Sequence, residues 1–263
     1  MMNINTDYCF LDDVLGEPFE TIYYPQESTL RTMNGKPYID PDDKSKALYE
    51  THACLLKAWI DTPYEVVRKS GKYELQGVHG RLGSDYIGCS SYWATKAGVT
   101  SAELTNYLKI SRTIGGHVVW PRIGNLSINP CRGGSRGFYD RLDLTLLDLK
   151  NWFEGKPARL ASAFDAAADF LTCSGNDFAS FVDTFCLNPF VDSQYRPYDG
   201  LSFADGEFHN VLTEMPGQFK VADRDCYLAM MAGSMDAIQK RNRMIGDYIH
   251  QMAEVLPKVY SGE

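Results

Sequence analysis

The sequence predicts a single α+β domain over residues 1–263, with a mixed or antiparallel β part before about residue 138 and a helical layer after it. Strand-like alternation is confined to the N-terminal half, whereas helical periodicity dominates the C-terminal half. A hydrophobic content of 44% supports a sizeable core. Because strands and helices do not alternate through the second half, a doubly wound sheet is not expected.

The first clear helix is expected to begin at Asp40 and to end before Pro63. Asp40 is a favourable N-cap, Pro41 suits the first helical position, and apolar side chains follow at helical spacing. His52 lies on that apolar face, which favours a packing role over a ligand role. Residues 1–39 show no clear period and predict an irregular or short-stranded lead-in.

A β-hairpin is expected next, because residues 64–75 alternate around a Ser-Gly pair at 70–71. Residues 77–85 then gather a histidine, an arginine and an aspartate among glycines. This composition predicts a surface loop of the kind that often carries function. The alternative is a plain connection between elements. A short helix is expected over residues 102–110.

Helices are expected at residues 139–154, 159–173 and 178–187, followed by a long irregular segment over residues 188–222. A loop of that length in a compact domain is usually functional or contains short elements of its own.

The final helix is the clearest element, because apolar residues recur in three- and four-residue steps from Leu228 to Leu256. Only Asn242 interrupts them. A buried asparagine can fix the register of a coiled coil, so a homodimer through this helix is one interpretation. The flanking positions offer no set of opposite charges, which favours a monomer with the helix packed within its own domain.

Composition and charge exclude several classes of protein. The N-terminus has no basic region followed by an apolar run, so no signal peptide is expected, and no window suits a membrane span. Seven scattered cysteines without a C-x-x-C pair argue against a disulfide framework or a zinc site. We therefore expect a cytoplasmic protein without a cofactor or metal. A net charge of −8 argues against binding extended duplex nucleic acid.

An arginine- and glycine-rich stretch from Gly115 to Asp143 is the main candidate for a functional site. Its local excess of positive charge within an acidic chain predicts an anion site. Residues 118–120 favour a strand that Pro121 ends, and residues 126–129 are expected to return as its hairpin partner. The charged residues of the stretch are Arg122, Arg132, Arg136, Arg141, Asp140 and Asp143.

A glycine loop follows that expected hairpin and precedes an expected helix. Strand, glycine loop and helix start form an arrangement that points backbone N–H groups at an anion. The loop matches neither a Walker A motif nor G-x-G-x-x-G. We expect His117, Asn129, Arg132 and Arg136 to converge on one concave surface. The expected ligand-binding residues are Arg122, Asn129, Arg132, Gly133, Gly134, Arg136 and Arg141.

Two residues of the stretch are candidates for catalysis. His117 would act as a general acid or base, the alternative being a strand histidine whose ring bonds a backbone carbonyl. Ser135 stands in residues 133–137, G-G-S-R-G, which match the nucleophile elbow G-x-S-x-G. That motif needs further parallel strands to carry its acid and histidine, and the helical second half does not supply them. A flexible or anion-binding loop is therefore the favoured interpretation of residues 133–137.

Four short phrases resemble an uncharacterised family of bacterial proteins known only as a domain of unknown function. They are L-G-S-D-Y-I at 82–87, G-G-H-V-V-W-P at 115–121, S-I-N at 127–129 with R-G at 132–133, and D-R-L-D-L-T-L at 140–146. The resemblance implies a shared fold. Because that family has no assigned activity, it implies no catalytic role.

Two classes of function follow from these observations. In the first, the protein binds or processes a phosphate-bearing small molecule or a nucleic-acid end at the glycine- and arginine-rich loop. In the second, it is a non-catalytic protein-interaction module in a phage- or mobile-element setting, which only the family resemblance suggests. The arginines have a structural alternative, in which they pair with Asp140, Asp143 and Asp148. The sequence does not decide whether the protein is an enzyme.

Overall fold

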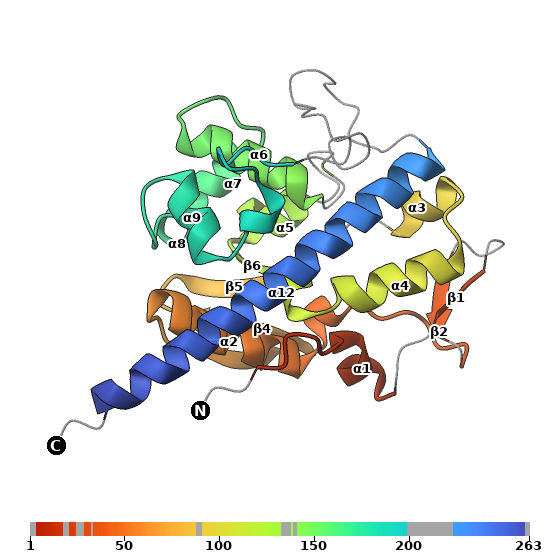
Figure 1. The fold of residues 1–263 in the computed structure, drawn as a ribbon, viewed down its shortest axis with the longest axis horizontal. Coiled ribbons are helices and arrows are strands. Elements are labelled where there is room, and N and C mark those ends of the chain that lie inside the picture. Colours follow the sequence, from red (N-terminus) through yellow and green to blue (C-terminus); the bar gives the residue numbers. More distant parts are fainter. Residues whose placement is uncertain are drawn as a thin grey trace.

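A computed structural model shows a small antiparallel sheet surrounded by helices, which confirms the predicted α+β class (Figure 1). The structure describes residues 4–17, 21–24, 29–32, 34–87, 91–132, 138, 141–198 and 223–260.

The sheet contains β3 (Tyr64–Lys69), β4 (Lys72–Gly77), β5 (Gly80–Tyr86) and β6 (His117–Pro121), in that order and antiparallel throughout. The expected hairpin is confirmed as β3 and β4. Ser70 and Gly71 have φ angles of 52° and 76°, as a two-residue turn that follows the twist of its strands requires.

Strand β5 occupies most of the stretch expected to be a surface loop, so that expectation is wrong. The sequence pattern did not indicate a strand at β5, because the glycines of this segment have low strand propensity. Gly83 has a packing reason: a Cβ at this position would lie 2.0 Å from the Nε atom of Arg122. The missing side chain lets the arginine lie against the strand.

The predicted hairpin partner of β6 is also wrong. Residues that were expected to form a returning strand instead form η3 (Gly124–Leu126) and α5 (Ile128–Pro130), and β6 pairs with β5. Ser127 stabilises the tight turn, because its Oγ accepts from the N–H of Ile123 at 2.7 Å and donates to the Gly124 carbonyl at 3.0 Å. In addition, a proline at position 130 has no N–H to donate to a ladder.

The N-terminal lead-in contains a helix that the sequence reading missed, α1 (Phe10–Leu15), and a two-stranded sheet of β1 (Thr21–Tyr24) and β2 (Thr29–Thr32). The predicted helix start at residue 40 is only partly correct. Asp40 caps a single 3-10 turn, η1 (Pro41–Asp43), and Ser45 caps the α-helix proper, α2 (Lys46–Ile60). The intervening break lets η1 leave the axis of α2 and approach the sheet.

Short helices fill the rest of the chain before residue 199. The helix expected at 102–110 is α4 (Ser101–Ser111), whose N-terminus has a capping box formed by Thr100 and Glu103. The helix expected at 159–173 is two helices, because the N–H of Ala167 is shared between the Ala163 and Phe164 carbonyls at a break. Residues 199–222 of the expected irregular segment lie outside the described ranges. The remaining elements are α3 (Ser91–Lys96), η2 (Ile114–Gly116), α6 (Leu142–Phe153), α7 (Ala161–Ala166), α8 (Ala168–Leu171), α9 (Phe178–Thr184) and η5 (Asn188–Phe190).

Helix α12 (Arg224–Tyr260) confirms the long C-terminal helix and runs the length of the molecule, with α6 to α9 on one side and α4 on the other (Figure 1). It contacts α2, α4, η2 and η5. Asn242 is buried within this packing, where its Oδ1 accepts from the Gly115 N–H at 2.6 Å and its Nδ2 donates to Thr113 Oγ1 at 2.9 Å. Asn242, the polar residue in the apolar stripe of α12, therefore bonds this helix to the segment that precedes β6.

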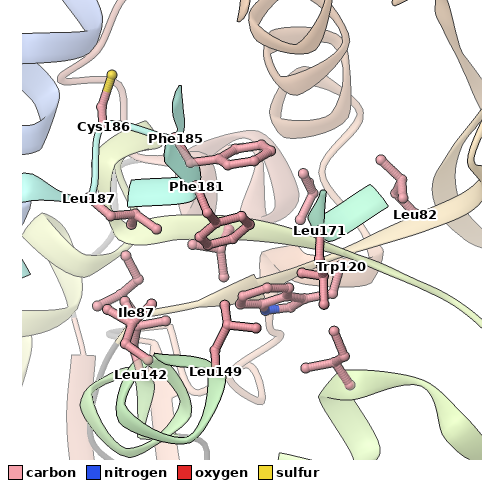
Figure 2. Close-up of a cluster of buried hydrophobic side chains, with 14 of the residues drawn as sticks. Leu82, Ile87, Trp120, Leu142, Leu149, Leu171, Phe181, Phe185, Cys186 and Leu187 are labelled. Atoms are coloured by element: carbon pink, nitrogen blue, oxygen red, sulfur yellow. The ribbon is translucent and has the colours of Figure 1, made fainter. Parts of the chain in front are cut away.

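The main core lies between the sheet and the helices α6 to α9. Figure 2 shows Trp120 of β6 beneath Phe181 of α9, with Leu142 and Leu149 of α6 beside the indole. The rings of Trp120 and Phe181 are stacked at a centroid distance of 6.2 Å. A second cluster joins α3 and α4 to the start of α12 through Leu104, Tyr107, Tyr227, Met230 and Met231.

Candidate functional site

A polar cavity opens where β4 and β5 separate. The two strands are paired only as far as Leu75 and Leu82, and η1 packs against both of them. The backbone N–H of Ser84 is thereby free to bond the Tyr49 hydroxyl, at 3.0 Å. The cavity, termed here the β5 pocket, has a volume of about 670 Å³. It is lined by Asp40, Asp42, Asp43, Lys72, Arg81, Ser84, Asp85, Tyr86, Pro121, Arg122, Gly124, Ser127, Asn129 and Pro130.

Among the described residues, the wall of the β5 pocket carries four carboxyl groups and three cationic side chains, and contains no aliphatic side chain larger than proline. Ligand pockets in proteins are usually lined mainly by apolar groups. A wall of this composition suits a hydrophilic ligand that offers charges and hydrogen bonds.

The cations of the wall form ion pairs near its surface. Asp43 pairs with Arg122 at 2.8 Å and with Lys72 at 2.6 Å, and Arg81 pairs with Glu74 at 2.6 Å. The side chains of Lys72 and Arg81 are 53% and 44% exposed. The Lys72–Asp43 pair is exposed enough to contribute little stability, so a ligand can bond Lys72 at small cost. Glu74 is only 6% exposed, so Arg81 must keep this partner when it bonds a ligand.

Asp85 is held from behind by a buried arginine. Arg132 has no exposed surface; its Nη1 pairs with Asp85 Oδ2 and its Nε donates to Thr145 Oγ1 of α6 at 2.9 Å. The pair fixes the carboxylate of Asp85 in the pocket wall and links β5 to α6.

Asp40 is held in the same manner by Arg112, which follows α4. The guanidinium Nη2 lies 3.3 Å from Asp40 Oδ2 and 2.6 Å from the Tyr38 hydroxyl. The Arg112 Cζ also lies 3.6 Å from the centroid of the Tyr86 ring, a cation–π contact. Arg112 is fully buried, so Asp40 faces the pocket with a fixed cation behind it.

Asp42 has a different environment, because a histidine and a hydroxyl lie next to it. Its Oδ1 accepts from Ser84 Oγ at 3.3 Å and lies 3.5 Å from Nε2 of His117. Burial, followed by the charges of Asp40 and Asp85, raises the pKa of Asp42 well above its usual range. Burial, with the positive charge of Arg112, lowers the pKa of His117 well below its usual range.

The tautomer of the His117 ring follows from its other contact. Nδ1 lies 2.8 Å from the Thr113 carbonyl, which accepts only, so Nδ1 carries the hydrogen. In the neutral ring Nε2 is then an acceptor, and it has no hydrogen-bond partner among the described residues. An acceptor nitrogen therefore faces Asp42, a carboxyl group whose pKa is raised.

The structure distributes the predicted site residues unevenly. Arg122 and Asn129 line the β5 pocket, and Asn129 Nδ2 donates to the Ser84 carbonyl at 3.0 Å. His117 and Arg132 lie behind the wall, bonded to Thr113 and Asp85. Strand alternation directs Ser84, near His117, and Asp85, bonded to Arg132, to opposite faces of β5. His117 and Arg132 therefore do not meet on one surface; each reaches the pocket through a carboxyl group.

The remaining predicted residues lie elsewhere. Arg141 pairs with Asp143 at the start of α6, with Nε 3.1 Å from Oδ1, as the structural alternative expected. Asp148 instead accepts from the N–H groups of Arg159 and Leu160. Gly133, Gly134, Ser135 and Arg136 lie outside the described residues.

The acidic half of the pocket was missed as a site. The run D-P-D-D at residues 40–43 was interpreted as the favourable start of a helix. A signal was present: three aspartates within four residues exceed what one N-terminus needs. Only the break before Ser45 turns these carboxyl groups toward β5.

The described part of the chain shows no metal site, no disulfide bond and no membrane-spanning helix. No three histidine, cysteine, aspartate or glutamate side chains come together as a metal site. The six cysteines that the structure describes are free thiols, and Cys131 is buried. No helix in these ranges has the length and apolar character to cross a membrane.

Residues 25–245 match the model of DUF6994, a family of unknown function. The chain belongs to this family. The match spans η1, β5, β6 and α4, and so includes every described residue of the β5 pocket. No curated protein and no solved structure matches the chain.

Proposed function

We propose that this DUF6994 protein binds a small phosphate-bearing molecule in the β5 pocket. The observation that carries the proposal is a hydrophilic cavity in which Lys72, Arg81 and Arg122 are all part of the wall. Arginine forks and lysine ammonium groups are the usual protein donors to phosphate. The sequence predicts further backbone donors from residues 133–137, which lie outside the described residues.

Three of the four carboxyl groups of the wall have a cationic partner of their own, which reduces their repulsion of an anion. Asp43, Asp40 and Asp85 each have an arginine partner. A phosphate near the rim would share Lys72 and Arg122 with Asp43 and would bond the exposed part of Arg81, which keeps Glu74 as its partner. The buried arginines, Arg112 and Arg132, contribute by holding the wall rather than by touching the ligand.

The exposed surface gives less support to a protein-interaction module. Large exposed apolar side chains within the described ranges are Ile39, Val78 and Leu126, from three separate segments. Interaction surfaces usually present larger contiguous apolar patches. A cytoplasmic setting, in which phosphorylated metabolites are abundant, suits the proposal and agrees with the free thiols.

A thermal-shift titration tests the proposal directly. Inorganic phosphate, alkyl phosphates, sugar phosphates and nucleoside monophosphates are added to the full chain, with sodium sulfate as a control for anions in general. A ligand at about 100 times its Kd stabilises the folded state by roughly 2.7 kcal/mol. We expect at least one phosphate ester to raise the Tm at low salt.

A matched pair of arginines localises the effect. Arg81, 44% exposed and 2.6 Å from Glu74, lines the pocket; Arg196, 47% exposed and 2.6 Å from Asp192, does not. Arg81→Ala is expected to remove most of the ligand-induced shift, and Arg196→Ala to retain it. Stabilisation by no phosphate ester, or equal loss in both variants, would contradict the proposed function and favour the interaction module.

A further inference from the structure

One carboxyl group of the β5 pocket differs from the other three. Asp40, Asp43 and Asp85 each lie against an arginine, whereas Asp42 has neither arginine nor lysine within salt-bridge distance among the described residues. Its side chain is 16% exposed. A carboxylate that is poorly solvated and lacks a cationic partner is costly, so this position favours either a neutral acid or a cation from outside.

The charged groups around Asp42 favour its protonated, neutral form. Asp40 on its own turn and Asp85 on β5 are negative, and each opposes a third negative charge. Arg112 from the α4 side is positive, but its contacts go to Tyr38, Asp40 and the ring of Tyr86. On the far side, His117 cannot accept a proton readily because it is fully buried beside Arg112. A neutral acid satisfies this environment best.

Nε2 of His117 is an independent observation that points to a hydrogen on Asp42. This nitrogen is fully buried, has no partner in the described part of the chain, and lies 3.5 Å from Asp42 Oδ1. A hydrogen on Oδ1 would satisfy it. Asn129 Oδ1 is a second buried acceptor without a partner, and it belongs to the pocket wall. A protonated Asp42 supplies the donor that His117 Nε2 lacks.

We propose that Asp42 is a neutral carboxylic acid in the empty pocket and releases its proton when a ligand with a protonated amine or amidine binds beside it. This proposal rests on the function proposed above. The O–H bond of Asp42 breaks, the proton passes to solvent, and the carboxylate then pairs with the ligand cation. The ligand is therefore a zwitterion, with a phosphate at Lys72, Arg81 and Arg122 and a basic nitrogen at Asp42.

The first experiment concerns the free protein. Carboxyl-carbon NMR of the wild type and Asp42→Asn, which identifies the Asp42 signal by its loss, is expected to show a neutral carboxyl at neutral pH. Asp42→Asn itself is expected to raise the Tm there, because the variant folds without having to take up a proton. An amide reproduces the donor that a neutral acid offers to His117. An ionised Asp42 at neutral pH overturns the proposal, whatever the ligand experiments show.

The second experiment compares ω-aminoalkyl phosphates of increasing chain length with the alkyl phosphates of the same length. Calorimetry in buffers of different ionisation enthalpy measures affinity and proton release together. We expect the best amino compound to bind about tenfold tighter than its match, since a charge-assisted bond contributes somewhat more than 1.4 kcal/mol. About one proton should be released per molecule bound, because the ammonium is already charged in solution.

The variant Asp42→Asn separates the two proposals. Measured as the ratio of its affinities for amino and plain alkyl phosphates of the same length, it is expected to lose the tenfold preference, and the proton release with it. Equal binding of amino and plain phosphates by the wild type overturns the present proposal and leaves the proposed function standing. Binding of neither class overturns the proposed function, and the ligand part of this proposal with it.

Discussion

The charge state and position of each carboxyl group in the β5 pocket depend on the residue packed behind it. Asp85 is paired with Arg132, which has no exposed surface. Asp43 is paired with Lys72, whose side chain is largely exposed to solvent. A buried pair differs from an exposed one mainly when a single partner is removed, because the other is left as an uncompensated buried charge. The residues that hold the pocket wall are therefore also residues that hold the fold.

Asp85→Asn is expected to lower the free energy of unfolding by about 3 kcal/mol, because it removes the negative charge that Asp85 places against the buried Arg132 guanidinium. Chemical denaturation measures the effect. The control is Asp236→Asn, which breaks the exposed pair with Lys240 and is expected to cost at most about 0.5 kcal/mol. The double variant Asp85→Asn/Arg132→Met should recover much of the loss. Equal effects of the two single variants would contradict a structural role for the Asp85–Arg132 pair.

The buried histidines predict acid sensitivity. Burial, with the charge of Arg241, lowers the pKa of His52 to about 4, and the pKa of His117 is also lowered. A lowered pKa means that the stability is present above the unfolded value of about 6.5 and is lost as the pH falls toward the folded value. Each such histidine contributes a slope of about 1.4 kcal/mol per pH unit in this window.

Asp42 opposes the histidines in the same window, because its pKa is raised and its neutral form is favoured as the pH falls. Stability conferred by a raised pKa is lost as the pH rises through the folded value. Denaturation from pH 6.5 to pH 4 should therefore show a shallower slope for His52→Asn and a steeper slope for Asp42→Asn than for the wild type. Parallel curves for all three proteins would show that neither residue titrates differently in the folded state.

At the scale of elements, sequence patterns predicted what periodicity determines and missed what tertiary contacts determine. The hairpin of β3 and β4 and the helix α12 follow from alternation and from helical spacing. Strand β5 was missed because Gly83 carries no strand signal, and its reason lies in the side chain of Arg122. The turn after β6 was assigned as a strand because a serine hydroxyl, rather than a pattern, fixes it.

Like the fold, the candidate site could be predicted only where a local sequence pattern marks its residues. His117, Arg122 and Asn129 were identified because they stand in a stretch of unusual composition, and two of them line the pocket. The aspartates of η1 were not, because a helix N-terminus explains acidic residues equally well. Their approach to β5 depends on the separation of β4 from β5, a contact between segments distant in sequence that no local pattern encodes.

Asn242→Leu tests the role of the polar position in α12. The substitution leaves the buried N–H of Gly115 without its acceptor, so the free energy of unfolding should fall by about 2 kcal/mol. Light scattering should give the same mass for variant and wild type, since the amide makes its contacts within one chain. Unchanged stability combined with a changed mass would instead indicate that Asn242 sets the register of a coiled coil between chains.

At the scale of the whole molecule, α12 joins the β part to the helical layer. Arg241 donates to the carbonyls of Gly115 and His117, at 3.0 and 2.6 Å, and to that of Phe185, at 3.2 and 3.1 Å. Its guanidinium thus bonds the start of β6 and the end of the α9 region at once, while Trp120 and Phe181 stack between the same two parts. These contacts argue that the two halves share one cooperative unit.

The prediction is a single unfolding transition. Tryptophan fluorescence reports on all four tryptophans, among them Trp120 in the sheet and Trp152 on α6, and far-UV circular dichroism reports mainly on the helices. The two probes should give the same denaturation midpoint. Arg241→Met removes the donor that both halves share and leaves three carbonyls without it. In one cooperative unit, its midpoint falls equally for both probes. Two independently folding halves would instead show separate midpoints, with a gap that the substitution widens.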